Sequence, residues 1–415
     1  MPADTLTPQP DLAPGVEEKI VRIGADLAQT IRAVLDLVPA DTRRPQELAK
    51  ACGLNKDVAY RVLKAVQQAD PIVVTHLIPG PAPLRKLLRG ARKLGVEVGV
   101  LAPAEEAVDR FETLIERDAG DRGSLDVIIS GWLPEVREKT ELLSRQNVYR
   151  GISQIKGASV EVLYDISVLV PNPDDRRLAD GVFVRGLRGL TRGRRDATVR
   201  FANRLLEPPA GRPPSMTLDG RPIRSLDDTI LQEFSDPPSL RAEKRTVGGS
   251  EYFCLAPDAI GADRAVDVVV AEFNPGCVWR YAPPGKSGRS GPYSEIHLPA
   301  RLSVFDVLVH RDLFPGSEPA LAVYDTAIDG LANINDPARD ADRIDVLASL
   351  LPIGHSPSGL RVLEIPRYDE LLRSVFAARG WNAEEFRVYR CRMPFPVYGS
   401  QICVSWECPQ MPAEG

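Results

Sequence analysis

The spacing of apolar residues changes near residue 158, and this change constrains the fold more than any other feature of the chain. Before it, apolar side chains recur every three or four residues, as on one face of an α-helix. The clearest stripe has steps of 4, 3, 4, 4, 3 and 4 residues: Val16, Ile20, Ile23, Leu27, Ile31, Val34 and Val38. After residue 158, period-two segments rich in β-branched residues predict strands, among them SVEVLYDISVLV and DGVFVRGL. Helices and strands therefore cluster instead of alternating, which predicts an α+β protein with mixed or mainly antiparallel sheets.

The length of 415 residues predicts more than one domain, because a single compact core rarely grows so large. We predict a helical domain over residues 15–100, a helical connector or dimerisation segment over 101–157, and an α+β body over 158–415. A stretch rich in Pro and Gly at 207–225 is either a long surface loop or a further boundary. The helix expected over 16–38 either packs in a core or pairs two subunits.

Charge is distributed unevenly along the chain. The whole sequence carries a net charge of −5, which argues against a protein that coats nucleic acid over its entire surface. Between Asp41 and Gly95, however, eleven Lys and Arg residues stand against four Asp and Glu residues, a local charge of +7. A basic module on an acidic chain is the pattern expected for one DNA-binding domain carried by a larger body.

Residues 45–67 have the pattern of two short helices joined by a tight turn. Gly53 supplies the positive φ that the turn needs, and Ala49 is small where the two helices would cross. Apolar residues at 48, 54, 58, 62, 63 and 66 close a small core between them. The second helix then projects Lys56, Tyr60, Arg61 and Lys64 outward, and such groups reach bases and phosphates when a recognition helix enters the major groove.

This stretch resembles the winged helix-turn-helix of bacterial transcriptional regulators, particularly the IclR type. The likeness is carried by Glu47-Leu48-Ala49, Gly53-Leu54 and Tyr60-Arg61-Val62-Leu63 followed by Val66, and it covers about 55 residues, from Asp41 to Gly95. Near the start of the second helix the IclR-type pattern commonly has a Ser or Thr that meets a phosphate, and this chain has Asp57 there. The resemblance implies DNA binding by residues 15–100.

The remainder of this domain is predicted from the resemblance and from charge. Residues Pro71–His76 would form the first strand of the wing, and a basic helix would follow with side chains near flanking phosphates. The alternative for this helix is an ordinary solvated face. The complete set of predicted DNA-binding residues is Arg43, Lys50, Lys56, Tyr60, Arg61, Lys64, Arg85 and Lys86.

Signatures of catalysis and of metal binding are weak in the rest of the chain. His297, His310 and His355 and an acidic series over 336–345 have no metal-site spacing, and we predict no cofactor and no metal. The six cysteines lack a CxxC pair and are expected to be buried thiols. Near the C-terminus, several cationic and aromatic residues alternate on two predicted strands, which suits an edge strand or a pocket for an acidic effector: Arg387, Tyr389, Arg390, Arg392, Tyr398 and Trp406.

We therefore expect a dimeric, sequence-specific DNA-binding transcriptional regulator whose body senses a ligand or assembles subunits. Its expected partners are double-stranded DNA, a second copy of the chain, and a small-molecule or protein effector. No apolar run approaches the roughly 18 residues that span a bilayer, so we expect a cytoplasmic protein without a membrane partner. The alternative is an enzyme or interaction protein in which the winged helix serves only dimerisation.

Overall fold

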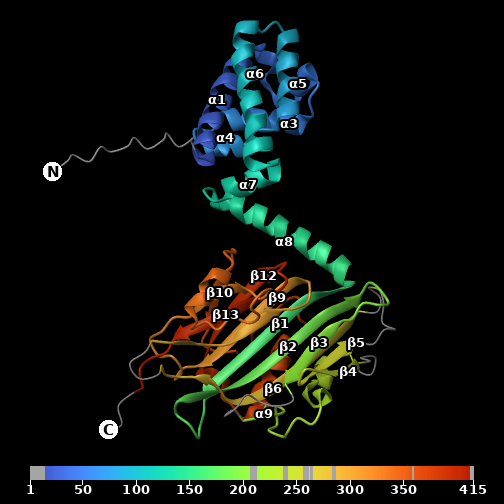
Figure 1. The fold of residues 1–415 in the computed structure, drawn as a ribbon, viewed down its shortest axis with the longest axis vertical. Coiled ribbons are helices and arrows are strands. Elements are labelled where there is room, and N and C mark those ends of the chain that lie inside the picture. Colours follow the sequence, from blue (N-terminus) through green and yellow to red (C-terminus); the bar gives the residue numbers. More distant parts are fainter. Residues whose placement is uncertain are drawn as a thin grey trace, which may run out of the picture. The chain divides into compact units, whose positions relative to one another are not determined.

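The computed structural model describes residues 15–205, 213–236, 242–255, 261, 265–282, 287–357 and 359–411. The chain divides into two units, residues 1–140 and 141–415 (Figure 1). Helices make up the first unit, and the second unit is built mainly from strands. The predicted α+β class, with helices first and a sheet body after them, is confirmed.

Within its described residues the N-terminal unit contains helices and no strand. Its α-helices are α1 (Val16–Leu37), α2 (Pro45–Cys52), α3 (Lys56–Val66), α4 (Pro71–Leu77), α5 (Pro81–Lys93), α6 (Val98–Thr113) and α7 (Arg122–Ser130). The 3-10 helix η1 (Ala40–Arg43) lies between α1 and α2, and the π-helix η2 (Leu114–Ala119) continues α6. Proline occupies the first turn of α2, α4 and α5, where its missing N–H costs nothing.

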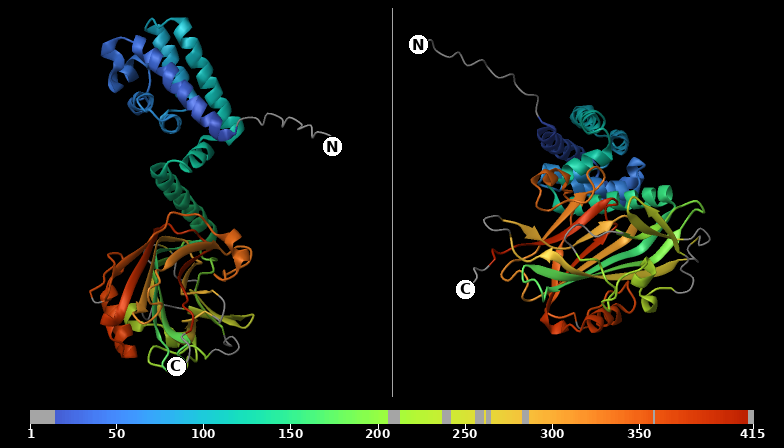
Figure 2. Two further views of the ribbon diagram at one scale, coloured as in Figure 1. Left: turned by 90° about the vertical axis from the view of Figure 1, so that its left-hand side faces the viewer. Right: turned by 60° about the horizontal axis from the view of Figure 1, so that its bottom comes forward.

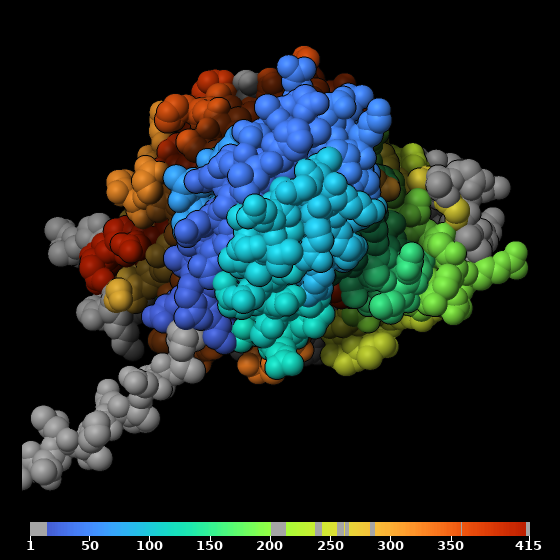
Figure 3. Space-filling view, turned by 90° about the horizontal axis from the view of Figure 1, so that it is seen from above, coloured from blue at the N-terminus to red at the C-terminus, as the bar shows by residue number. Residues whose placement is uncertain are grey.

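The core of this unit lies beneath α1, whose predicted apolar stripe is buried. Helix α1 lies beside α6 across the surface of the unit (Figure 3). Leu101, Ala104 and Phe111 of α6 are fully buried in the same core. The segment from residue 101 to Thr140 therefore belongs with the N-terminal helices, and the division falls within α8 (Pro134–Lys156) and not at residue 100.

The predicted wing is wrong. Residues Pro71–Leu77 form helix α4, because the side chain of Asp70 caps the helix by accepting the N–H of Ile72 and Pro71 sets the first turn. The β-branched residues of this segment favour a strand locally, but the packing of α4 against α1 prevails. The hydroxyl of Thr75 contacts the carbonyl of Ile20 at 3.3 Å, and an added Cβ at Gly24 would lie 2.1 Å from the carbonyl oxygen of Pro71.

The second unit is organised around a six-stranded sheet in the order β11-β12-β9-β1-β2-β6. The central strands β1 (Ala158–Pro171) and β9 (Ala300–His310) pair in parallel, and the other neighbours are antiparallel. The remaining strands of this sheet are β2 (Leu178–Arg192), β6 (Val266–Trp279), β11 (Leu350–Gly354) and β12 (Phe386–Pro394). The predicted mixed, mainly antiparallel sheet is thus present.

Both faces of this sheet are covered. One face packs against α9 (Tyr368–Arg379), which lies across the strands (Figure 2). The opposite face packs against two smaller sheets. One contains β10 (Ala320–Asp325), β13 (Ser400–Glu407), β7 (Arg289–Ser290) and β8 (Tyr293–Ile296), and the other contains β3 (Arg200–Leu205), β5 (Ser250–Leu255) and β4 (Ala242–Val247).

Helix α8 belongs to this unit from Glu141 onward. The ring of Tyr149 on α8 lies 5.4 Å from the ring of Phe395, and the backbone N–H of Leu347 donates to the carboxylate of Glu141 at 2.8 Å. The stretch 207–225 is described only from residue 213 onward, and that part lies in the second unit. Among the helices that the structure describes, none is long and apolar enough to cross a membrane.

Candidate nucleic-acid interface

The two helices predicted over 45–67 are present as α2 and α3. Gly53 ends α2 in the left-handed conformation at φ 66°, and its N–H donates to the carbonyls of Ala49 and Lys50. Asn55 then caps α3 by accepting the N–H of Asp57 at 2.9 Å. Glycine ends one helix and asparagine begins the next, so the turn between them needs only three residues.

Helix α3 presents one polar stripe to solvent. Its buried positions, Ala59, Val62, Ala65 and Val66, face the core of the unit. The opposite side carries exposed residues spaced as neighbours on one helical face: Lys56, Asp57, Tyr60, Arg61 and Lys64. Tyr60 is 54% exposed, which leaves its ring available to a partner. The sequence-predicted residues of this helix therefore share one surface.

Helix α5 brings further positive charge to the turn between α2 and α3. An added Cβ at Gly90 would lie only 2.6 Å from the backbone and side chain of Cys52, so α5 touches α2 closely there. One helical turn earlier, Lys86 extends beside Gly53: an added Cβ at Gly53 would lie 3.9 Å from the Lys86 Nζ. Lys50 on α2 and Lys86 on α5 are both exposed. The α2–α3 turn is thus flanked by lysines from two helices.

Among the residues that the structure describes, the exposed lysines around the α2–α3 turn are not neutralised by neighbouring carboxylates. Within the described part of the chain, Lys50, Lys56, Lys64 and Lys86 have no ion pair with a carboxylate. Arg61 is exposed but also donates from Nε to the carbonyl of Leu77 at 3.1 Å, which ties α3 to the end of α4. Arg122 donates to two neighbouring carbonyls of the same helix end, at 2.9 Å and 2.6 Å.

Two of the predicted DNA-binding residues instead hold the fold together. Arg85 donates to Glu112 at 2.7 Å and 2.6 Å and to Asp109 at 2.6 Å, which ties α5 to α6. These hydrogen bonds raise the pKa of Arg85 and lower the pKa of Glu112. Arg43 donates to the carbonyl of Val38 at 3.0 Å and to that of Asp36, at the end of α1. The acidic residues of α6 lie outside the basic stretch, so local charge counting missed them.

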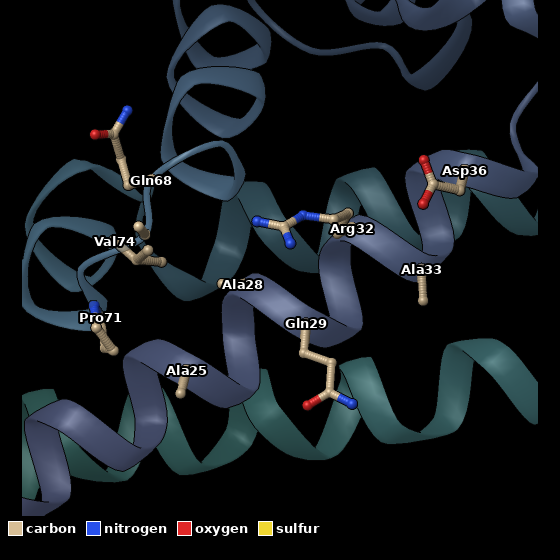
Figure 4. A pocket seen from close by; sticks show the side chains of 10 residues that line it. Ala25, Ala28, Gln29, Arg32, Ala33, Asp36, Gln68, Pro71 and Val74 are labelled. Atoms are coloured by element: carbon tan, nitrogen blue, oxygen red, sulfur yellow. The ribbon is translucent and has the colours of Figure 1, made fainter.

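A surface hollow of about 410 Å³ lies between α1 and the segment that links α3 to α4 (Figure 4). Ala25, Ala28, Gln29, Arg32, Ala33 and Asp36 line it from α1, and Gln68, Ala69, Pro71 and Val74 line it from the other side. Arg32 donates from Nε to the carbonyl of Val66, the last residue of α3, at 3.0 Å. This hollow therefore adjoins the C-terminal end of α3.

Strand β12, which carries Arg387, Tyr389, Arg390 and Arg392, is not the edge strand that the alternation suggested. Strand β12 is an inner strand between β11 and β9, and alternate side chains point to its two faces. Arg390 donates two hydrogen bonds of 2.7 Å to the fully buried carboxylate of Asp306, which also accepts from the Tyr368 hydroxyl. Burial and the charge of Asp306 raise the pKa of Tyr368 well above its usual range. Trp406 is fully buried and stacks on Phe314 at 5.3 Å.

A second polar network lies on the opposite face of the six-stranded sheet. Arg185 of β2 donates to Asp165 of β1 at 2.8 Å and contacts the Nδ1 of His297 at 2.9 Å, and Ser294 donates to Asp165. Burial, followed by the positive charge of Arg185, lowers the pKa of His297 to about 3. The imidazole is therefore neutral at physiological pH, and its Nδ1 accepts from the guanidinium.

The remaining candidates are accounted for by local contacts. His310 lies 3.4 Å from the Glu385 carboxylate and packs against Phe386. Among the described residues, no three His, Cys, Asp or Glu side chains gather as metal ligands. All six cysteines are free thiols: Cys52, Cys254, Cys391 and Cys403 are buried, and Cys277 and Cys408 are partly buried.

Comparison with known proteins identifies no family. No family model matches the chain, and no curated protein matches it. One solved structure, of a proposed protease from Parabacteroides distasonis ATCC 8503, aligns at 9% sequence identity with a TM-score of 0.25. The alignment covers 60% of this chain and 40% of that chain. A likeness at this level supports no conclusion about fold or activity.

Proposed function

We propose that the chain is a DNA-binding transcriptional regulator that reads double-stranded DNA with α3. One observation carries the proposal: the exposed stripe of α3 joins Lys56, Tyr60, Arg61 and Lys64 on one surface, and the lysines that flank the adjoining turn have no ion pair among the described residues. A helix of this kind fits the major groove, where guanidinium and ammonium groups recognise guanine edges. Lys50 and Lys86 would contact phosphates, which position the helix without reading sequence.

In this proposal, the rest of the chain controls DNA binding by α3. Two copies would place two α3 helices on a site with two-fold symmetry. A ligand or protein that binds one conformation of the body better than another would change the fraction of molecules able to bind DNA. The body has its own core and its own sheets, as expected of a sensor or assembly domain that folds independently of the reader.

A second candidate function is a helical module that only assembles subunits. Asp57 favours it, because this exposed carboxylate lies on the same stripe of α3 and repels phosphate. In that case the stripe would contact an oppositely patterned protein surface instead of DNA.

The deciding experiment is a titration of labelled duplex DNA with the full chain at several salt concentrations, followed by fluorescence anisotropy. Contacts to phosphates release counterions, so affinity should fall steeply with salt. Lys56→Ala with Lys64→Ala should weaken binding by at least about tenfold and reduce the slope of log affinity against log salt by about two per chain. Both side chains are exposed, so the variant should fold.

A matched control removes the same charge elsewhere. Lys139 and Arg195 are exposed outside the α2–α3 region, and Lys139→Ala with Arg195→Ala should leave both affinity and slope unchanged. Equal losses in the two variants would mean that only net charge matters. The absence of binding by a well-folded chain at low salt would support the assembly module.

A further inference from the structure

Helix α1 has a second regular face that points away from its own core. Exposed residues recur on it at steps of 4, 3, 4, 3 and 4: Glu18, Arg22, Ala25, Gln29, Arg32 and Asp36. Val21 and Leu37 border this outer α1 face and are 42% and 55% exposed. Residues at this spacing share one helical face, and the small residues Ala25 and Ala33 permit close approach of another helix.

Two hollows lie along the outer α1 face. The first is the hollow of about 410 Å³ beside Gln29, and the second, of about 370 Å³, is nearer the start of the helix. Glu17, Glu18, Val21, Arg22, Ile72 and Trp132 line the second hollow, whose exposed surface is mostly apolar. Trp132 is 38% exposed there, so a large apolar side chain from another molecule would find a matching surface.

The outer α1 face is complementary to itself when a second copy runs antiparallel. In such a pair, residues at equal distances from Gln29 face each other. Arg22 then meets Asp36 of the second copy and Ala25 meets Ala33, and each of these contacts occurs twice. Neither Arg22 nor the Asp36 carboxylate has an ion pair within its own described chain.

The charged residues also favour this alignment of the two helices over alignments shifted by one helical turn. A shift of one helical turn, which pairs residues about position 27, would set Glu18 against Asp36 and Arg22 against Arg32. The opposite shift, about position 31, would place Arg22 opposite Ala40, beyond the end of α1, and so remove the pairing of Arg22 with Asp36. Like charges in contact are unfavourable, so the pairing about Gln29 is the one that these residues favour.

We propose that the outer α1 face binds a second copy of the chain, with the two α1 helices antiparallel and the two-fold axis at Gln29. The inference deepens the proposed function, because it supplies the dimer that a two-fold DNA site requires. Arg32 joins this face to the last carbonyl of α3, so pairing also fixes the end of the reading helix.

Charge reversal tests the pairing by sedimentation velocity of the full chain over a range of concentrations. The native chain should sediment at twice its 45.4 kDa mass. Arg22→Glu and Asp36→Arg should each raise the dimer dissociation constant at least about tenfold, and the double variant should restore it. Within one helix these residues are about 21 Å apart, so restoration can only come from contact between copies. Arg89→Glu, an equal charge change on α5, should have no effect.

A second measurement locates the axis directly. Gln29→Cys should form a disulfide between copies on oxidation with diamide, whereas Lys50→Cys and the native chain should not, because only residue 29 meets its own counterpart. A chain that stays monomeric, a dimer unaffected by both charge reversals, or a dimer of the Gln29→Cys variant whose introduced thiols fail to couple would each overturn the interface. A monomer that binds DNA overturns the interface alone, and a charge-sensitive dimer that binds no DNA overturns the proposed function alone.

Discussion

Arg85 and Lys86 are neighbours on α5, yet their side chains have different roles. The Arg85 guanidinium is held by Glu112 and Asp109 of α6, whereas Lys86 extends beside Gly53 at the α2–α3 turn. The same basic stretch of sequence predicts DNA binding for both residues. A residue's charge therefore says little about its role until its partners are known.

One pair of variants should distinguish the roles of these two residues. Lys86→Ala should weaken DNA binding several-fold and lower the salt slope by about one, with an unchanged melting temperature, because it removes a single phosphate contact. Arg85→Gln should leave DNA affinity unchanged and lower the melting temperature by a few degrees, on the order of 1–3 °C. Anisotropy and thermal unfolding measure the two effects, and a reversed pattern would contradict the assignment.

His297 makes stability depend on pH. Burial and the charge of Arg185 lower its pKa to about 3 in the folded chain, whereas an unfolded histidine takes up a proton near pH 6.5. Below about pH 6.5 the unfolded state therefore binds more protons, and the free energy of unfolding falls as the pH falls toward about 3. Above about pH 6.5 neither state binds the proton, so His297 contributes no pH dependence there.

A substitution at His297 separates its contribution to the pH dependence of stability from that of the carboxylates. His297→Gln keeps an acceptor for Arg185 and removes the titrating group. Between about pH 7 and pH 5, the urea midpoint of the native chain should fall more than that of the variant. Parallel pH dependences in the two proteins would show that the histidine is not held neutral.

Some helices and strands were predictable from residues close together in the sequence, and others were not. Gly53, Asn55 and the buried spacing of α3 act within a few residues, so the two helices and their turn were predictable. The segment Pro71–Leu77 was not, because its β-branched residues suggest a strand while its cap and its contact with α1 make a helix. The place of β12 inside the sheet also depended on distant strands. The sequence alone did not decide whether the apolar stripe of α1 packs in a core or pairs two subunits. The structure buries this stripe in the core, so the outer α1 face is the one left exposed.

The contact between α2 and α5 can be tested at Gly90. An added methyl would lie 2.6 Å from Cys52, so Gly90→Ala should push the helices apart and destabilise the chain by about 1–3 kcal/mol. Because this contact places Lys86 beside the turn, DNA affinity should fall as well. Gly99→Ala on α6 is the matched control, since an added Cβ there meets nothing within 4 Å. Urea unfolding compares the two, and equal stabilities would contradict the close packing.

At the scale of the whole molecule, charge and architecture support the same division of labour. The chain is acidic overall, and its positive charge is concentrated in one helical segment, 41–95. The two units have separate cores, so the proposed reader and the proposed sensor can vary independently. The outer α1 face would then join two readers into one symmetric unit.

Sequence-specific DNA binding can be measured by selecting DNA from a pool of randomised duplexes with the purified chain and sequencing the selected DNA. A motif with two-fold symmetry should be enriched, and this enrichment should disappear with Lys56→Ala and Lys64→Ala and persist with Lys139→Ala and Arg195→Ala. Failure of a folded, dimeric chain to enrich any motif would contradict a sequence-specific regulator.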